Sequence, residues 1–378
     1  MSDSSMPQQN SKQFRLGEGR ISGYLSLFLG VASLFAVVCF LFPEFFTTPD
    51  LRTAYPIAFF RKILFFSLVL SFSFGLGTFI LNKRKRMGVI GMLCSTVAIL
   101  LGGWQIEPKE FDTGLLYLGL DWAVLDLVVL ALIFIPLEKI FPKREAQIIL
   151  RPEWQTDLVY FCIGHFFIQI IALITITPSA VLFGWLDLET LQSRVSSWPF
   201  VLQFFCALVL TDLAQYTMHR FFHGNRVLWR FHALHHSIKS LDWLAASRLH
   251  FVDIFITRAF GFIPIFVMGF SRNVVVVYVI FIAFQAVLIH SNTKINFGFL
   301  KYVFVTPQYH HWHHSDDPKT YNKNFAVHLP LIDFIFGSYY LPGNEWPASY
   351  GIHESLPMGY LRQLVHPFMK KKTSQVNQ

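Results

Sequence analysis

The sequence is poor in charged residues. Of its 378 residues only 14% are charged, whereas 53% are hydrophobic and the mean hydropathy is +0.46. Such a composition excludes an ordinary soluble globular protein and favours a chain that lies mostly in a bilayer. The net charge of +8 is concentrated in short segments between apolar runs. There it indicates membrane orientation rather than nucleic-acid binding.

Cysteine is also scarce. The 4 cysteines all lie inside apolar runs, and no CxxC pair occurs. The sequence therefore gives no support to a disulfide framework or a thiolate metal site. A cleavable signal peptide is missing too, because the first apolar stretch, 21–43, is too long for a signal-peptide core and no small-residue cleavage site follows it. We expect this stretch to be retained as a membrane span.

Long apolar runs divide the chain into predicted membrane spans. A helix needs about 20 residues to cross the hydrocarbon core. A block at 251–290 is interrupted only by Phe270-Ser271-Arg272-Asn273 and predicts a helical hairpin. Before it come single spans at about 21–43, 63–81, 87–104, 115–136, 157–186 and 199–218. We therefore predict an all-α fold, a polytopic integral membrane helical bundle.

Positive charges predict the orientation of this bundle. Basic clusters follow the second, fourth and sixth spans, at 83–86, 139–151 and 220–230. Because cytoplasmic loops carry the excess of Lys and Arg, the N-terminus and the segments 219–250 and 291–378 should be cytoplasmic. The expected location is a cell membrane, the inner membrane if the chain is bacterial.

Histidine is the residue in excess. Of 15 histidines only His165 precedes residue 219, and we expect it to serve helix packing through hydrogen bonds. The others include one HxxxH pair, two HxxHH triads and one histidine at the end of the hairpin, each pattern placing imidazoles on a shared helical face. These are His219 and His223; His232, His235 and His236; His310, His313 and His314; and His290. We interpret His311 as structural, and His328 and His366 as surface histidines.

The number of imidazoles points to two metal ions. A structural zinc site takes about four ligands and a catalytic one about three, so eight or nine imidazoles exceed what one ion needs. Nitrogen-rich ligation without thiolates suits Fe, Zn, Cu or Ni. The sequence has no paired Glu-x-x-His elements, which argues against a carboxylate-bridged di-iron bundle.

These motifs resemble those of the fatty acid hydroxylase / sterol desaturase superfamily. The resemblance covers about 151–345 and adds Thr306-Pro307 before the second triad, together with the segments 151–157, 228–232 and 333–337. It implies a cytoplasm-facing, histidine-ligated dimetal site that holds two Fe ions, with Zn able to replace them in purified protein, and O₂ as co-substrate. The implied ligands are His219, His223, His232, His235, His236, His290, His310, His313 and His314. The implied reaction hydroxylates or desaturates a C–H bond of a lipid, which could be a sterol, a fatty acyl chain or an ether lipid.

The resemblance also orders the chain into parts. We expect a cytoplasmic tail at 1–20, a transmembrane bundle of about four spans at 21–150, the catalytic domain at 151–345 and a cytoplasmic tail at 346–378. The expected partners are a lipid from the bilayer and a separate electron donor, whether cytochrome b5-like, a ferredoxin or a reductase. A separate donor is required because His366-Pro367-Phe368 lacks the glycines of a cytochrome b5 haem motif.

Two polar residues are predicted to support the ligands. Asp212 lies two turns before His219 on the same helical face, where it can orient the ring as a hydrogen-bond acceptor. An intramembrane carboxylate is more often functional than incidental. Asn292 follows His290 closely and is a further candidate.

Two other functions compete with lipid oxidation. A membrane zinc-dependent lipid hydrolase would use the same histidines but needs a general base, and neither triad contains Glu. A non-catalytic metal transporter or electron-transfer subunit would carry its ligands at mid-membrane depth on separate spans. Here the histidines crowd the predicted cytoplasmic ends of the helices.

Overall fold

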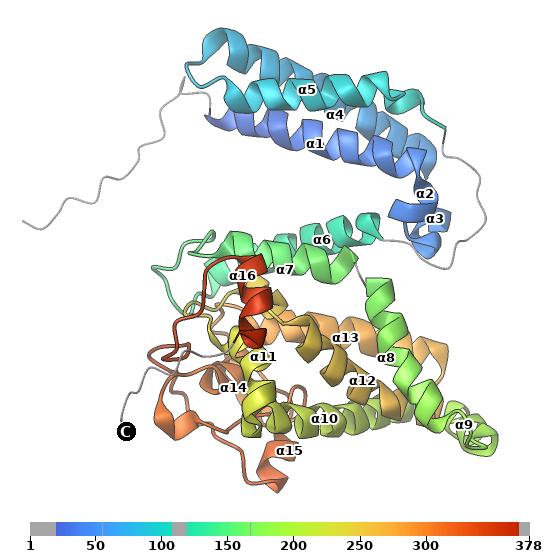
Figure 1. Ribbon diagram of the computed structural model, residues 1–378, viewed down its shortest axis with the longest axis vertical. Coiled ribbons are helices and arrows are strands. Elements are labelled where there is room, and N and C mark those ends of the chain that lie inside the picture. The colour runs from blue at the N-terminus through green and yellow to red at the C-terminus, as the bar shows by residue number, and fades with distance from the viewer. Residues whose placement is uncertain (1–19, 55, 108–118, 167, 370–378) are drawn as a thin grey trace, which may run out of the picture. The chain divides into compact units, whose positions relative to one another are not determined.

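The computed structural model describes residues 20–54, 56–107, 119–166 and 168–369 (Figure 1). In these ranges the regular structure consists of helices, with isolated β-bridges only. Seven helices are long and apolar enough to cross a membrane. They are α1 (Arg20–Leu41), α4 (Ile57–Leu81), α5 (Arg86–Leu100) with η1 (Gly103–Gln105), α6 (Leu120–Ile140), α10 (Phe200–Gly224), α12 (Phe251–Met268) and α13 (Arg272–His290). The predicted all-α membrane bundle is confirmed.

The chain divides into two compact units, 1–122 and 123–378. In the first, α1, α4 and α5 approach closely through small residues, as membrane helices commonly do. A Cβ on Gly91 would lie 2.4 Å from the backbone carbon of Ser26, and Ser71 Oγ donates to the Ser26 carbonyl at 2.8 Å. The short helices α2 (Pro43–Phe46) and α3 (Pro49–Ala54) follow α1.

The helix α6 packs in the second unit, although the sequence placed it in the N-terminal bundle that was predicted to end at residue 150. Leu130 and Phe134 form a core cluster with Phe161, Trp243 and Leu244. Hydropathy identifies a membrane span but carries no information about its neighbours. That is why the sequence did not reveal this assignment.

The predicted single span at 157–186 is two helices, α7 (Trp154–Phe166) and α8 (Ile168–Phe183). The first begins beside Arg248, whose guanidinium pairs with Glu153 at 3.0 Å. The second ends beside Phe266, near the other end of α12. Neither helix is among the seven that are long and apolar enough to cross a membrane, so the predicted single span is not found among the described residues.

The end of this unit that carries the histidines gathers several chain segments. Glu138 Oε1, in the last turn of α6, accepts from the backbone N–H of Trp243 at 2.7 Å and of Asn292 at 2.9 Å. The C-terminal ends of α6 and α13 therefore meet there. Around them lie α11 (Arg226–His236), η2 (Trp243–Ser247), η3 (Gly298–Tyr302), α14 (Pro307–His313), η4 (Pro318–Thr320) and α15 (Pro330–Ile335). The helix α9 (Glu189–Ser196) lies beside the opposite end of α12.

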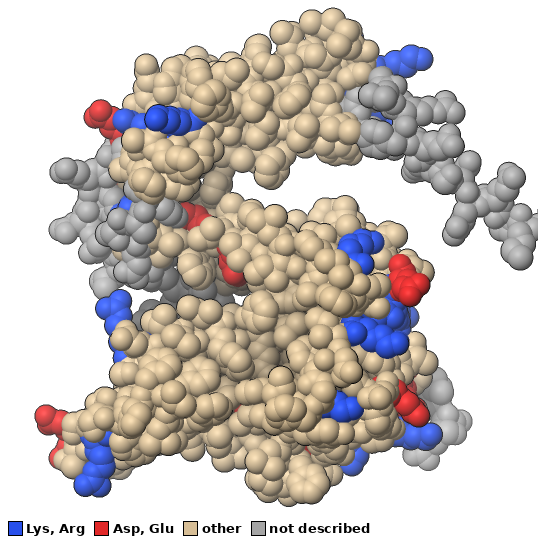
Figure 2. All heavy atoms as spheres, turned by 180° about the vertical axis from the view of Figure 1, so that it is seen from behind, with Lys and Arg blue, Asp and Glu red and all other residues tan. Residues whose placement is uncertain are grey.

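The segment predicted as a C-terminal tail folds back onto this unit as far as residue 369, through α16 (Tyr360–Val365) and η5 (His366–Phe368). Tyr350 Oη lies 2.8 Å from His311 Nδ1, and the Leu364 carbonyl lies 3.0 Å from His250 Nε2. Charged side chains are sparse over the broad surface in Figure 2, as expected for helices that face lipid.

Candidate metal centre

Histidines from four helices converge into two adjacent groups. The last turns of α10 supply His219 and His223, α13 ends in His290, and the remaining histidines come from α11 and from the end of α14. One group is His219, His223, His232, His236 and His313, and the other is His235, His290, His310 and His314. Within each group the ligand atoms lie within 4.8 Å of one another. All nine predicted ligands are thus brought together, His290 included.

Each HxxHH triad is split between the two groups. In each triad the i and i+4 histidines join one group, and the i+3 histidine joins the other. Successive residues on a helix point about 100° apart, so the last two rings of a triad diverge. The planes of His235 and His236 lie at 87°, and those of His313 and His314 at 86°. Each triad therefore contributes to both groups.

The spacing of the ring nitrogens fits metal ions. Nε2 of His232 lies 3.0 Å from that of His219, and Nε2 of His290 lies 3.1 Å from that of His235 and 3.0 Å from that of His310. Ligands at right angles, each about 2.1 Å from one ion, are about 3.0 Å apart. The buried Nε2 atoms of His223 and His313 have no hydrogen-bond partner among the described residues. Both atoms belong to the five-histidine group, so a cation within that group would satisfy them.

Hydrogen bonds at the other ring nitrogen leave Nε2 free to bind a metal. Carbonyl and carboxylate oxygens can only accept, so a ring whose Nδ1 faces such an oxygen carries its proton there. Five rings do so: His219 toward Phe325 O at 2.7 Å, His232 toward Asp253 Oδ2 at 2.6 Å, His235 toward Arg248 O at 3.2 Å, His290 toward Ala286 O at 2.6 Å and His313 toward Lys323 O at 2.8 Å. Asp253 was missed from the sequence, although a carboxylate at the start of an apolar run was a signal for it.

Burial keeps the imidazoles neutral. It lowers the pKa of His313 to about 3, and burial with the neighbouring imidazoles lowers the pKa of His235 and His236 well below the ordinary histidine value. The same causes act on the pKa of His310 and His314. Neutral imidazole is the form that binds metal ions.

A buried ion network holds the first turn of α7 against the segment that follows the first triad. Asp157 accepts from both Arg151 and Arg248, and Arg151 also reaches Asp242 at 2.8 Å. The backbone carbonyl of Arg248 is the acceptor for His235 Nδ1. The network therefore fixes the position of a ligand ring without touching it.

Sequence comparisons assign the chain to a family. Residues 204–338 match the family described as Fatty acid hydroxylase. The chain is 30% identical over 285 residues to the ornithine lipid hydroxylase OlsE of Rhizobium tropici, an alignment that covers 74% of this chain and 84% of that protein. The chain belongs to the fatty acid hydroxylase / sterol desaturase superfamily.

Two less similar relatives also have names that refer to lipids. The chain is 27% identical over 161 residues to the alkylglycerol monooxygenase of Danio rerio, covering 43% of this chain and only 35% of that protein. It is 24% identical over 175 residues to the very-long-chain aldehyde decarbonylase GL1-6 of Oryza sativa subsp. indica, with 42% and 27% covered. No solved structure matches the chain. Membership of a family of lipid hydroxylases and monooxygenases, with membrane-capable helices, makes this chain an integral membrane, lipid-oxidising enzyme.

Asp212 does not contact His219, so the predicted hydrogen bond is wrong. Its carboxylate accepts from the backbone N–H groups of Val327, His328 and Leu329 at 2.9, 3.1 and 2.7 Å. The acceptor for His219 is instead a backbone carbonyl of the same strap of chain, 325–329. This strap brings its N–H groups to the carboxylate, which the sequence could not show. Asp212 therefore fixes the segment 325–329 through three hydrogen bonds, and the Phe325 carbonyl of that segment orients the His219 ring.

Asn292 also supports the site indirectly. Its side chain accepts from the Arg144 N–H at 2.9 Å and donates to the Arg144 carbonyl at 3.2 Å, which ties the chain after α6 to the end of α13. No hydrogen bond to a ligand histidine is found for it among the described residues.

The remaining histidines follow the sequence interpretation only in part. His165 lies 2.8 Å from Asp126 Oδ2, and both ring nitrogens of His311 have partners, so their packing roles are confirmed. The surface interpretation of His328 is wrong. That ring is 1% exposed and lies 2.7 Å from Gln285 Oε1. A polar side chain on α13 gives it a buried partner that the sequence did not reveal.

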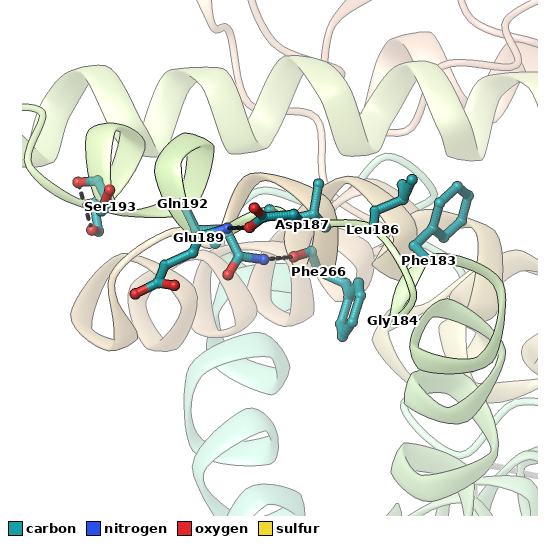
Figure 3. A pocket seen from close by; sticks show the side chains of 11 residues that line it. Phe183, Gly184, Leu186, Asp187, Glu189, Gln192, Ser193 and Phe266 are labelled. Carbon is teal, nitrogen blue, oxygen red and sulfur yellow. Dashed lines mark hydrogen bonds between the residues drawn. The ribbon is translucent and has the colours of Figure 1, made fainter.

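A surface hollow near the far end of α12 shares no residue with the two histidine groups (Figure 3). It is lined in part by Phe183, Asp187 and Phe266, and Gln192 Nε2 donates to the Phe266 carbonyl at 2.9 Å. Thirteen residues of helix, about 20 Å, separate Phe266 from Asp253. We therefore assign the chemistry to the histidine groups and not to this hollow.

Proposed function

We propose that this chain is an O₂-dependent lipid hydroxylase that binds two iron ions, one in each histidine group. The observation that carries this proposal is the pair of adjacent all-histidine groups that share both HxxHH triads. A hydrolytic zinc site needs a nearby carboxylate as general base. Neither group contains Asp or Glu among the described residues, and Asp253 is already bound to a ligand ring.

The reaction needs electrons as well as oxygen. Hydroxylation converts R–H, O₂, two electrons and two protons into R–OH and water. Iron supplies the O₂-reducing chemistry when it is bound. The chain's own residues hold the imidazoles in one tautomer and orient them, and burial excludes water from the reacting bond. The protein uses a separate electron donor and works on the cytoplasmic face of the membrane.

We infer a polar membrane lipid as the substrate. The relative that aligns over most of its length is named an ornithine lipid hydroxylase, and the alkylglycerol monooxygenases are named for a glycerol-based lipid. The site lies at the ends of membrane-capable helices, within reach of lipids in the adjacent leaflet. Hydroxylation is favoured over desaturation because both of these names denote addition of oxygen.

Oxygen labelling tests the proposal. The protein is loaded with iron in lipid nanodiscs and given membrane lipid extract and a ferredoxin that has been reduced with dithionite and freed of the excess. Under ¹⁸O₂ it should yield lipids that carry one ¹⁸O atom. The matched control is the same protein loaded with zinc, which should yield none. Lipid cleavage that proceeds equally well without oxygen would establish a hydrolase instead. Products lighter by two hydrogens would show a desaturase.

A further inference from the structure

The metal centre approaches the protein surface at one ligand. Eight of the nine histidines are buried, whereas His223 is half-buried. The ring of Trp229 lies beside it, with centroids 5.0 Å apart, and also lies 5.4 Å from the ring of His236. Trp229 is itself half-buried. This indole therefore connects the surface with the five-histidine group.

The surface around Trp229 is basic with an apolar middle. Between α10 and α11 the chain turns at Asn225, whose Oδ1 accepts from two backbone N–H groups of α11. Arg220 and Arg226 are exposed at this corner, and Phe221 and Val227 are 52% and 62% exposed. The sequence from 213 to 241 contains no Asp or Glu. We call residues 220–230 the α10–α11 corner.

We propose that the α10–α11 corner docks an acidic one-electron carrier protein, and that Trp229 is the contact through which electrons reach the five-histidine group. This inference rests on the proposed function. Apolar centres with a charged rim are typical of protein interfaces, and opposite charge steers a partner to its site. Each turnover oxidises two reduced carriers by one electron each. These two electrons and two protons, together with the two electrons of the C–H bond that is broken, reduce O₂ to one water and the hydroxyl oxygen of the product.

Binding measurements test the corner directly. The probes are an acidic plant-type [2Fe–2S] ferredoxin and the acidic haem domain of a cytochrome b5, with basic cytochrome c as the opposite-charge control. The protein is held in phosphatidylcholine nanodiscs, so that the bilayer itself is neutral. We expect an acidic carrier to bind, to lose affinity as salt rises, and to bind at least about tenfold more weakly to Arg226→Glu. Arg194→Glu, at an arginine on α9 that is also exposed, is the matched control and should bind as the parent protein does.

Electron transfer tests the indole. Trp229→Leu should keep the affinity for the carrier within about twofold but slow the oxidation of reduced carrier at least tenfold in stopped flow. The variant's iron content is measured first, so that slow oxidation caused by loss of iron is not mistaken for slow electron transfer through residue 229. In Arg226→Glu the rate of turnover with sub-saturating carrier should fall by the same factor as the affinity. This rate is compared with a single turnover of protein that has been reduced with dithionite, freed of excess dithionite and exposed to O₂.

The outcomes separate this inference from the proposed function. Parent protein that is reduced with dithionite, freed of excess dithionite and then exposed to O₂, but oxidises no lipid, contradicts the proposed function. Dithionite-driven oxidation together with carrier binding that Arg226→Glu leaves intact overturns only the docking site. Arg226→Glu that weakens binding to anionic vesicles but not to either carrier would assign the corner to lipid headgroups, which also overturns it.

Discussion

Single histidines should control the metal content because each ring belongs to only one group. His235→Ala removes a ligand from the four-histidine group, and His313→Ala removes one from the five-histidine group. We expect each variant to lose metal and to lose more than about 100-fold in activity, since even the outer partners of ligands are worth about 10–100-fold. His353→Ala, at an exposed histidine, is the control and should behave as the parent. Metal analysis and product formation measure the effect, and full activity in either ligand variant would exclude the triads as the site.

Asp253 should matter for metal affinity although it belongs to neither group. Its carboxylate is 2% exposed and accepts from His232 Nδ1 at 2.6 Å, which orients the ring and makes Nε2 a better donor. Asp253→Ala should weaken metal binding by about 10–100-fold. Competition with a chelator measures this, with Asp187→Ala at the exposed far end as the control. Unchanged affinity would show that packing alone orients the ring.

At this scale the sequence predicted the residues that converge but not their supports. Histidines at i, i+3 and i+4 share a helical face, so all nine could be chosen from spacing and resemblance. Which ring joins which group depends on how α11 and α14 face each other, and spacing within one helix does not contain that. Backbone acceptors such as Phe325 O carry no side-chain signal at all. Asp253 did carry a signal, a carboxylate at the start of an apolar run. A carboxylate in an apolar run was also what drew attention to Asp212.

Among the elements, the ion network between α7 and the 242–248 segment should be a main source of stability. Asp157 is fully buried and accepts from two arginines that are themselves buried. In Asp157→Ala each buried guanidinium keeps one carboxylate partner but loses the other, and each buried N–H left without an acceptor typically costs about 1–3 kcal/mol. We expect a lower unfolding temperature in detergent and loss of the metal at a lower temperature than in the parent. Glu189→Ala, at an exposed carboxylate, should change neither.

The approximate positions of the 7 span-capable helices were predictable, because about 20 apolar residues identify a span regardless of its neighbours. The further span predicted at 157–186 is two shorter helices. The assembly of the helices was not predictable. The helix α6 joins the second unit through Phe134 and Trp243, contacts for which hydropathy has no signal. The division of 157–186 into α7 and α8 was hidden for a similar reason, since the residues at the boundary, 166–168, are all apolar.

For the whole molecule, the helix ends predict a single orientation. The C-terminal ends of α6, α10 and α13 and the start of α12 all lie at the histidine end of the second unit, and the basic clusters 139–151 and 220–230 lie there too. Positive loops remain in the cytoplasm, so this end should be cytoplasmic and α9 external.

Cysteine labelling in intact cells checks this orientation. Ser193→Cys on α9 should react with an impermeant maleimide, and Asn344→Cys should react only after lysis, because both sites are exposed. The parent chain, whose 4 cysteines lie in apolar runs, gives the background. Labelling of Asn344→Cys in intact cells would place the metal centre outside the cytoplasm, and would then require an electron donor on that side.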